Sequence, residues 1–334
     1  MKKIIALVLS LVLTLSLAAC GSSAPAATEA PSNVEAPAAE TFKVAIIQQL
    51  DHSSLDEIRT AIEAQLNTLA AEKGITVEIT YDNGQNDTSM LTQIATQVVA
   101  DKPDMIIPIA TLAAQYAVLA AEGTNIPIVY AAISDPESAG LTGLANVTGV
   151  SDALNTPFIL DMMLAAQPDV KTVGLLYSTS EINSLTPIAQ AKEYLDSKGI
   201  AYIEKTGTTS GEITEAAASL VGRVEAVFTP TDNAVMAAEA AVAELLNAGG
   251  IAHYTGADSF VQSGAFTTCG VNYTELGTKS ADIAFDILMG GEIGEFVVMD
   301  GGIITVNTTA ADACGIDYTV FNTMANTINA ITVD

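Results

Sequence analysis

The stretch DMIIPIATLAAQYAVLAAEGTNIPIVYAAISDP (residues 104–136) decides the fold class. It begins with an apolar segment of strand length, continues with an Ala-rich segment of helical length, and reaches a second apolar strand after Gly123. A helix between two such strands is typical of a parallel sheet, because parallel strands need a long crossover connection. Ser134 and Asp135 follow the second strand, at the edge where parallel sheets bind ligands.

The same order recurs further along the chain, in EAVFTPTDNAVMAAEAAVAELLNAGGIAHYTGADSF (residues 225–260). Pro108 and Pro230 are separated by nearly the same number of residues as Lys43 and Lys171, which begin two other similar strands. These offsets favour two like α/β lobes in tandem. The alternative is that any chain with alternating strands and helices resembles itself.

Strand and helix signals alternate throughout the folded part. Several helical segments stop at a glycine just before an apolar strand, as at Gly74, Gly123 and Gly199. We therefore predict an α/β fold made of two doubly wound parallel-sheet lobes joined by a hinge.

The N-terminus predicts export. Residues 1–19 combine two lysines, the apolar run IIALVLSLVLTLSLAA and small residues before Cys20, the pattern of a cleaved signal peptide. LAAC (17–20) resembles the bacterial lipobox, in which the cysteine is lipidated; an ordinary signal peptide and a short membrane anchor are the alternatives. Residues 20–41 are rich in Ala, Pro, Ser, Thr and Glu and are expected to form a disordered tether. We expect an extracytoplasmic lipoprotein, anchored to the outer face of the cytoplasmic membrane.

The composition excludes one class of partner. The chain has 12 Lys and Arg against 39 Asp and Glu, a formal net charge of −27 at pH 7. Such a surface repels nucleic acid, so we expect no nucleic-acid partner. Trp is absent and aromatic residues make up 5% of the chain, so the core is expected to be aliphatic and rich in Ala.

No catalytic or metal-binding pattern is present in the sequence. There is no G-x-S-x-G, H-E-x-x-H, C-x-x-C or G-x-x-x-x-G-K-[ST] sequence. His52 has no partnered nucleophile, and His253 lies within a predicted strand, where we expect it to be buried. We therefore predict no enzyme, no cofactor and no metal site.

Cys269 and Cys314 are the cysteines of the folded part. They could pair in an exported protein, but nothing in the sequence places them within bonding distance. We favour two buried free thiols.

Polar residues that follow the predicted strands are the candidate ligand contacts. Helix N-termini at the carboxyl ends of such strands direct their N–H groups toward a ligand. The candidates of the first lobe are Gln49, Asp51, His52, Thr111, Ser134 and Asp135. Those of the second lobe are Asn183, Ser184, Thr231, Asp232, Asn233 and Asp258. Each could instead cap the helix that follows, but their convergence on one face of both lobes favours a cleft.

These residue types suit a small zwitterion. Hydroxyls and helix N-terminal amides bind a carboxylate, and a carboxylate such as Asp232 or Asp258 binds an ammonium group.

From Lys43 to about Asp317 the chain resembles the substrate-binding lipoproteins of bacterial ABC importers, specifically the tryptophan/tyrosine-type family with a type I periplasmic-binding-protein fold. The segments that carry the resemblance include KVAIIQQLDHSSLDEIRTAI (43–62), IPIVYAAISDPESAGL (126–141), VGLLYSTSEINS (173–184), VFTPTDNAV (227–235) and GVNYTELG (270–277).

The resemblance implies capture of a free amino acid, aromatic or otherwise hydrophobic, by a monomer that delivers it to a membrane permease driven by an ATPase. The family's cleft motifs match Asp51, His52, Thr111, Ser134, Asp135, Asn183, Ser184, Thr231, Asp232 and Asn233. Three positions depart from the family pattern, and a more polar pocket would shift preference away from large aromatic ligands. These departures are Gln49, Leu112 and Cys269.

The implied fold also sets the expected domain limits. Lobe 1 is expected to comprise residues 42–150 and about 268–300, and lobe 2 residues 151–267 and about 301–334. We place the three crossings between lobes near 149–152, 258–267 and 301–307, and expect closure about them to enclose the ligand.

Two other classes of function stay open. A ligand-sensing protein for a nucleoside or sugar would use the same fold; as part of a receptor it is expected to continue into a transmembrane or signalling segment after NAITVD (329–334). An exported hydrolase would need a nucleophile and a base within reach of each other.

Overall fold

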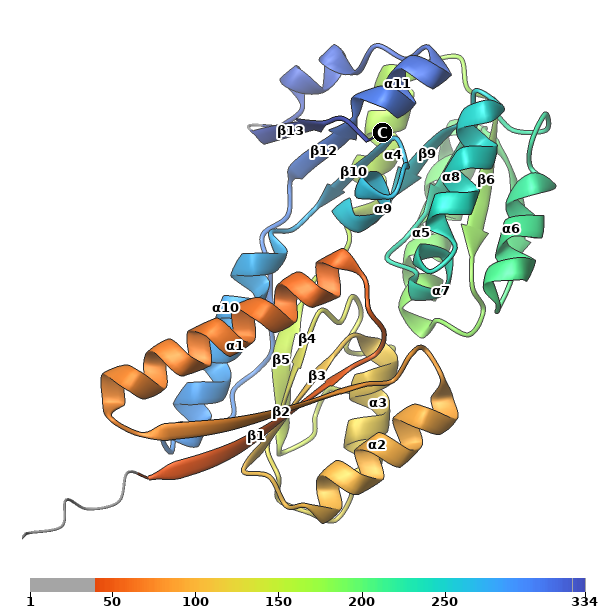
Figure 1. The fold of residues 1–334 in the computed structure, drawn as a ribbon. Helices are drawn as coiled ribbons and strands as arrows, with labels where there is room; N and C mark the ends of the chain where they lie inside the picture. Colours follow the sequence, from red (N-terminus) through yellow and green to blue (C-terminus); the bar gives the residue numbers. More distant parts are fainter. Residues whose placement is uncertain (1–39, 326, 334) are drawn as a thin grey trace, which may run out of the picture. The chain divides into compact units, whose positions relative to one another are not determined.

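The computed structural model describes residues 40–325 and 327–333. The predicted signal peptide, Cys20 and all but the last two residues of the predicted tether lie outside the described residues. The described residues fold into two α/β lobes (Figure 1), which confirms the predicted fold class. Among these residues, no helix is long and apolar enough to cross a membrane.

Lobe 1 is built on a sheet with the strand order β11-β5-β4-β3-β1-β2, parallel in every pairing described. Its strands are β1 (Thr41–Gln48), β2 (Thr76–Asn83), β3 (Met105–Ile109), β4 (Ile128–Ala131), β5 (Val147–Ser151) and β11 (Val297–Val298). Its helices are α1 (Ser53–Lys73), α2 (Thr88–Ala100), α3 (Thr111–Ala120) and α10 (Tyr273–Leu288). Helices α1 and α10 pack together on one face of the sheet, and α2 and α3 pack together on the other.

Lobe 2 is built on a sheet with the order β13-β12-β10-β9-β8-β6-β7, in which β10 and β12 are antiparallel. Its strands are β6 (Thr172–Tyr177), β7 (Ala201–Thr206), β8 (Ala226–Thr229), β9 (Ala252–Thr255), β10 (Thr267–Gly270), β12 (Ile303–Asn307) and β13 (Thr327–Ile331). Its helices are α4 (Thr156–Ala166), α5 (Ile182–Lys198), α6 (Ser210–Ala218), α7 (Asn233–Met236), α8 (Glu239–Ala248), α9 (Asp258–Gln262), α11 (Thr308–Cys314) and the 3-10 helix η1 (Tyr318–Thr323).

The two lobes repeat one topology. The first five strands of each lobe have the same spatial order, β2-β1-β3-β4-β5 in lobe 1 and β7-β6-β8-β9-β10 in lobe 2. This agreement confirms the prediction of two like lobes in tandem. The carboxyl ends of β1, β3 and β4, and of β6, β8 and β9, therefore carry corresponding loops.

The chain crosses between the lobes in three places within the described residues. The crossings lie at residues 152–155, between β5 and α4, at 271–272, between β10 and α10, and at 299–302, between β11 and β12. The first and third lie within a few residues of their predicted positions. The second comes later than predicted, because β10 stays in the sheet of lobe 2 as far as Gly270.

Helix α1 shows how the sequence positions one wall of the site. Its buried apolar residues recur every three or four positions, at Leu55, Ile58, Ile62 and Leu66. At Gly277 of α10, a Cβ atom would lie 2.5 Å from the carbonyl oxygen of Ile58. Because only glycine permits this approach, α10 packs closely on α1 near the end that carries residues 52–55.

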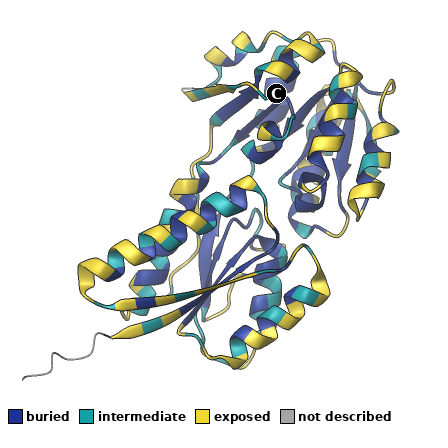
Figure 2. Cartoon of the chain, viewed as in Figure 1, coloured by how far each residue is buried: buried dark blue, intermediate teal, exposed yellow. Residues whose placement is uncertain are grey.

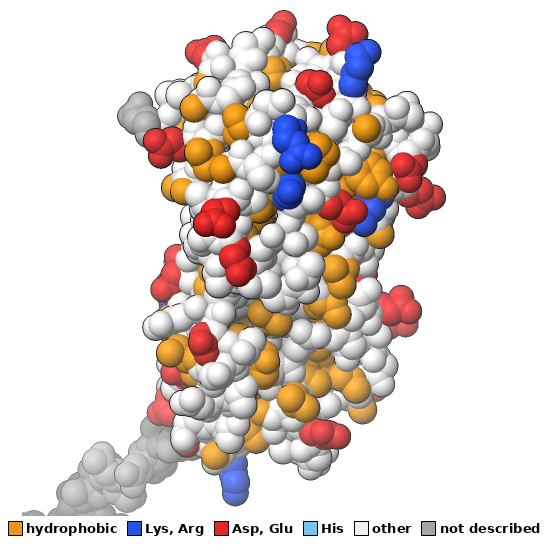
Figure 3. Space-filling model, turned by 90° about the vertical axis from the view of Figure 1, so that its right-hand side faces the viewer, with side chains coloured by type: hydrophobic (Ala, Val, Ile, Leu, Met, Phe, Trp, Pro, Cys, Tyr) orange, Lys and Arg blue, Asp and Glu red, His pale blue; other side chains and the backbone are white. Residues whose placement is uncertain are grey.

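The strands in the middle of both sheets are buried (Figure 2). Every residue of β3, β4, β8 and β9 is buried, as expected for parallel strands covered on both faces. Cys269 and Cys314 are free thiols; Cys269 is buried and Cys314 is half-buried, so the prediction of buried thiols is correct for Cys269 alone. On the face shown in Figure 3, acidic side chains are dispersed among uncharged ones, with a few Lys and Arg.

His253 is fully buried in lobe 2, as predicted from its place in a strand. Its Nδ1 lies 3.0 Å from Glu239 Oε1, and its Nε2 lies 2.8 Å from the hydroxyl of Thr229. Burial raises the pKa of Glu239, although His253 opposes this shift. The three side chains satisfy one another's polar atoms inside the core, with the exception of Glu239 Oε2.

Replacing Glu239 by Ala should lower the free energy of unfolding of the full-length chain by about 1–3 kcal/mol, because His253 loses its buried partner. Glu239→Gln keeps an oxygen that can accept from His253 Nδ1 and should cost less. Urea unfolding followed by circular dichroism measures both values. Equal stability of Glu239→Ala and the wild type would show that the contact contributes nothing.

Candidate ligand-binding site

A cavity lies between the lobes, at the carboxyl ends of their strands. Lobe 1 lines it with residues from the starts of α1 and α3 and from the loop after β4. Lobe 2 lines it with residues from the start of α5, from α7 and α9, and from the loops that precede α7 and α9. Asp152 of the first crossing and Tyr273 at the start of α10 complete it. Its lining consists of His52, Ser54, Leu55, Ala110, Thr111, Ala132, Ser134, Asp152, Asn183, Thr231, Asp232, Asn233, Met236, Ala257, Ser259, Phe260 and Tyr273. No Lys or Arg is among them.

Lobe 1 supplies two helix N-termini. Helices α1 and α3 begin at Ser53 and Thr111, and their first N–H groups have no partner within the helix. One of these groups, the N–H of Leu112, donates to Gln49 Oε1 at 3.0 Å. The others, with the hydroxyl of Thr111, make this side of the cavity suitable for an anion.

Two alanines that line the cavity have a backbone conformation that favours glycine. Ala110 has φ 73° and ψ 163°, and Ala132 has φ 58°. Residues held in such regions cluster at ligand sites, where the surrounding structure enforces them. They lie just after β3 and β4, so both strand ends turn sharply at the cavity wall.

Unpaired polar atoms line the cavity from both lobes. Asn183 Oδ1, Ser259 Oγ and His52 Nδ1 are buried and have no hydrogen-bond partner among the described residues. Asn183 is held in place through its other amide atom, Nδ2, which donates to the carbonyl oxygen of Thr231 at 2.6 Å. Buried polar atoms without partners are costly, so atoms of this kind at a cavity indicate contacts for a polar ligand.

Asp152 places a carboxylate in the cavity. It lies in the first crossing, is 6% exposed, and accepts hydrogen bonds from Ser134 Oγ at 2.9 Å and from the hydroxyl of Tyr273. No ion pair to a Lys, Arg or His is found for it among the described residues. Burial raises the pKa of Asp152, and a cation in the cavity would oppose that shift.

Asp232 also lines the cavity, but its carboxylate oxygens already have partners. Oδ2 accepts from the backbone N–H of Ser178 at 2.7 Å and from Ser184 Oγ at 2.6 Å, and Oδ1 accepts from the N–H of Val235 at 2.9 Å. The residue is therefore the N-cap of α7 and joins three segments of lobe 2. The sequence analysis gave two roles for Asp232, as a helix cap or as a contact for the ligand's ammonium group. The contacts found in the structure are those of a helix cap.

His52 lies at the cavity as predicted and spans the lobes. Its Nε2 lies 3.3 Å from Asn233 Oδ1. Burial lowers the pKa of His52 to about 4, against smaller opposing effects of Asn233, Asp56 and Asp51. The ring is therefore neutral at neutral pH, and it can donate from one nitrogen and accept at the other.

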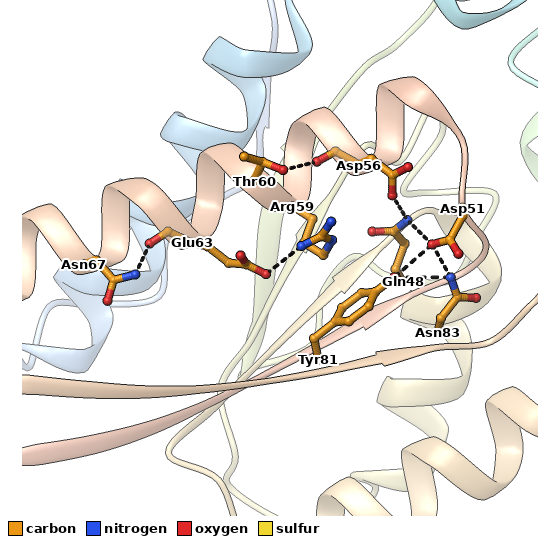
Figure 4. Close-up of polar contacts among 9 residues, drawn as sticks. All are labelled: Gln48, Asp51, Asp56, Arg59, Thr60, Glu63, Asn67, Tyr81 and Asn83. Atoms are coloured by element: carbon orange, nitrogen blue, oxygen red, sulfur yellow. Dashed lines mark hydrogen bonds and ion pairs between the residues drawn. The ribbon is translucent and has the colours of Figure 1, made fainter.

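Asp51 does not reach the cavity. Its side chain is exposed beside β2, where Oδ1 accepts hydrogen bonds from Tyr81, Asn83 and Gln48 (Figure 4). Gln48 also donates to Asp56 at 2.8 Å, so this group links β1, β2 and α1 within lobe 1.

Four other predicted residues lie outside the cavity lining. Gln49 and Asp135 make contacts between the lobes, Gln49 Nε2 donating to Glu181 Oε1 at 2.9 Å and Asp135 Oδ2 accepting from Thr186 Oγ1 at 2.6 Å. Asp258 accepts from Ser54 Oγ of lobe 1 at 3.0 Å. Ser184 lies behind the cavity, bonded to Asp232.

The structure adds cavity residues that the sequence analysis did not select. Asp152 belongs to the first crossing, and Tyr273 begins α10 directly after the second. Leu55, Met236 and Phe260 are apolar residues, Leu55 in the first turn of α1 and the other two on the short helices α7 and α9. Asp152 could have been selected, since it follows β5 as the predicted residues follow their strands. The departures at Gln49, Leu112 and Cys269 all lie outside the lining, so they say little about the cavity's polarity.

The lobes are in direct contact around the cavity. Ser134 Oγ lies 2.8 Å from Thr231 Oγ1, in addition to the interlobe contacts of His52, Gln49 and Asp258. The cavity holds about 30 Å³, room for on the order of one or two water molecules. A ligand the size of an amino acid can therefore enter only when the lobes separate.

Comparison with known proteins identifies the family. Residues 43–321 match the family described as ABC transporter substrate binding protein. The chain is 32% identical over 260 residues to the tyrosine-binding protein of Clostridioides difficile (strain R20291), covering 76% of this chain and 75% of that protein. The chain therefore belongs to the ABC transporter substrate-binding proteins, a family of binding proteins rather than enzymes.

Two solved structures bear on the conformation. The ABC domain from Streptococcus pneumonia in complex with L-Trp is 28% identical, covers 86% of this chain and 100% of its own, and superposes with a TM-score of 0.80. The ligand-free, open structure of a substrate-binding protein with adhesive properties from Clostridium difficile is 31% identical, covers 88% and 100%, and has a TM-score of 0.66. The TM-score is lower for the structure described as open and ligand-free than for the complex with L-Trp.

Proposed function

We propose that this protein is the extracytoplasmic receptor of an ABC importer for a free amino acid. The observation that carries the proposal is that the cavity is lined both by the buried Asp152 carboxylate and by residues at the N-termini of α1 and α3. The carboxylate suits an α-ammonium group, and the helix N-termini suit an α-carboxylate. A sugar or a nucleoside carries neither charge.

The side chain of the ligand would contact the apolar part of the lining, formed by Leu55, Met236, Phe260 and Tyr273. Met and aromatic residues make favourable contacts with aromatic rings. The relatives described as tyrosine-binding and as a complex with L-Trp support L-Tyr and L-Trp as the first ligands to test.

Membership of the family supports delivery of the ligand to a permease and its ATPase. The signal peptide and lipobox pattern of residues 1–20 supports an anchor at Cys20 on the outer face of the cytoplasmic membrane. In this proposal the protein acts as a monomer, and closure of the lobes about the three crossings presents the loaded receptor to the permease.

A ligand screen tests the proposed function. The full-length chain is mixed with each of the twenty common L-amino acids, with D-glucose and with adenosine, and thermal unfolding is recorded. We expect at least one amino acid to stabilise the protein by about 2.7 kcal/mol at a concentration of 100 Kd, because it binds only the folded state.

Two analogues of the best ligand serve as matched controls. For L-Trp they are tryptamine, which lacks the carboxylate, and indole-3-propionate, which lacks the ammonium group; neither should stabilise the protein at the same concentration. Stabilisation by glucose or adenosine alone, or equal binding of L-Trp and indole-3-propionate, would refute the proposal.

A further inference from the structure

Glu181 is a buried carboxyl that joins the two lobes beside the cavity. It precedes α5 in lobe 2 and is 0% exposed. Its Oε1 accepts from Gln49 Nε2 of lobe 1 at 2.9 Å, and its Oε2 accepts from Asn233 Nδ2 of lobe 2 at 2.9 Å. Glu181 does not line the cavity, so contact with a bound zwitterion does not explain why this carboxyl is buried here.

These contacts form a chain that leaves lobe 1 and returns to it. It runs from Gln49 to Glu181, then to Asn233, whose Oδ1 lies 3.3 Å from Nε2 of His52. Gln49 follows β1, and His52 precedes α1 and lines the cavity. Separation of the lobes would break this chain at Gln49 and at His52, and would open Glu181 to water.

The surroundings of Glu181 contain a second acid and no base in the charged form. The nearby acid is Asp232, the N-cap of α7, and His52, which is neutral at neutral pH, connects to Glu181 through Asn233. The remaining side-chain partners, Gln49 and Asn233, are uncharged, and no Lys or Arg forms an ion pair with Glu181 among the described residues. Burial, and then the charge of Asp232, raise the pKa of Glu181 to about 8, from an ordinary value of 4.5.

The two buried acids differ in what lobe separation would change. Asp232 receives its hydrogen bonds from Ser178, Ser184 and Val235, which all belong to lobe 2 and move with it. Asp232 lines the cavity between the lobes, but of the two acids only Glu181 accepts a hydrogen bond from a lobe 1 side chain. The two carboxyls influence each other's ionisation, and we assign the proton taken up on closure to Glu181 because closure changes its hydrogen bonding directly.

We propose that closure of the lobes over an amino acid takes up one proton from solution at Glu181, so that capture of the ligand is favoured by falling pH. This inference rests on the proposed function, because it requires closure around a ligand. Glu181 does not touch the ligand; it acts as a positioning residue, through Gln49 and through Asn233 to His52.

The direction of the pH dependence follows from the two states. In the open state the carboxyl faces water and is ionised above about pH 4.5, whereas in the closed state its pKa is about 8. The closed state thus binds more protons between these values, and its advantage is lost as pH rises through about 8. The protonated carboxyl must donate from one oxygen, and Asn233 can accept this proton with its amide group reversed, its nitrogen then donating to Nε2 of His52. Linkage to one proton changes Kd by at most tenfold per pH unit.

Titration calorimetry of the full-length chain with L-Trp and L-Tyr tests the proposal. At pH 7 the binding enthalpy is measured in several buffers that differ in ionisation enthalpy, and the slope gives the number of protons taken up. We expect an uptake approaching one proton per ligand bound, and a Kd that rises between threefold and tenfold per unit from pH 6 to pH 8.

Glu181→Gln removes the titrating group while it keeps the size of the side chain. We expect its proton uptake to fall close to zero. Its affinity at pH 8 should be at least as high as that of the wild type. Asp135→Asn is the matched control, because it removes another carboxylate that bonds across the lobes, and hydrogen bonds lower rather than raise the pKa of Asp135 despite its partial burial. Its proton uptake should equal that of the wild type.

The outcomes separate this inference from the proposed function. Tight binding with no proton uptake, or uptake that persists in Glu181→Gln, overturns the inference and leaves the proposed function intact. If no amino acid binds, the proposed function fails, and the carboxyl carbon shifts of the labelled protein then decide the inference. A Glu181 midpoint close to the ordinary value of 4.5 in the closed protein overturns it, and a midpoint raised toward about 8 supports its premise.

Discussion

Asp152→Asn should weaken binding of the amino-acid ligand by about a hundredfold or more, while the protein stays as stable as the wild type. The substitution removes the charge that is expected to pair with the ligand's ammonium group, and loss of one partner of a buried ion pair costs about 3–5 kcal/mol. An Asn side chain keeps an oxygen that can accept from Ser134 Oγ. The affinity therefore changes through charge rather than through loss of shape.

The stability of Asp152→Asn should be unchanged or slightly higher at pH 7. Burial raises the pKa of Asp152 above its ordinary value of 3.8, so ionisation of this carboxyl in the folded protein costs stability above that pH. An uncharged Asn avoids that cost. Calorimetric titration and urea unfolding, carried out on the same preparation, measure the two effects.

Asp51→Asn is the matched control for Asp152→Asn. Asp51 is an exposed carboxylate of lobe 1 that bonds to Tyr81 and Asn83, away from the cavity. Its replacement should change Kd by less than about threefold, as expected for a surface carboxylate. Wild-type affinity in Asp152→Asn, or a comparable loss in Asp51→Asn, would contradict the placement of the ammonium group.

Asp232→Ala should lower the free energy of unfolding by about 3–5 kcal/mol. The substitution leaves the buried N–H groups of Ser178 and Val235 and the hydroxyl of Ser184 without their acceptor, and it removes the N-cap of α7. Affinity should fall as well, because residues 231–233 line the cavity. Urea unfolding of the full-length chain measures the change.

Asp232→Asn separates the structural role from a ligand contact. Asn caps helices as well as Asp does and keeps one acceptor oxygen, so it should cost about half as much stability as Ala. If Asp232→Ala unfolds at the same urea concentration as the wild type but no longer binds ligand, Asp232 contacts the ligand directly, and the capping role assigned here is incorrect.

The fold could be predicted because local signals agreed with the topology. Apolar segments such as residues 105–109 alternate with helical segments that stop at glycines, and only a parallel sheet accommodates that order. The internal repeat could also be recognised in the sequence, and the structure agrees with it, because the strands of each lobe have the same spatial order. The second crossing was misplaced because β10 looks like any other strand, and nothing local shows which sheet receives it.

The candidate site was predicted in part, for a reason that lies in strand geometry. Residues after a strand reach the correct edge of the sheet, which explains why His52, Thr111, Ser134, Asn183 and Asn233 line the cavity. Which way each side chain then points depends on the turn that follows. Asp51, one residue before His52, points instead to the edge of lobe 1.

Other residues of the site could not be found from strand ends. Tyr273 reaches the cavity from the start of α10, directly after the second crossing, so its place depends on how the two lobes meet. Nothing in the sequence distinguishes Glu181 from the other polar residues of its loop. Its burial depends on Gln49, which lies far away along the chain.

The cavity lining divides by origin. Asp152, which would meet the ammonium group common to every amino acid, lies on the first crossing, whereas Leu55, Met236 and Phe260 lie on helices of the individual lobes. Substitutions at these helical positions can alter which side chain is accepted without disturbing the pivots of the molecule. Proteins with this architecture can therefore change their ligand specificity while the hinge motion that captures the ligand stays the same.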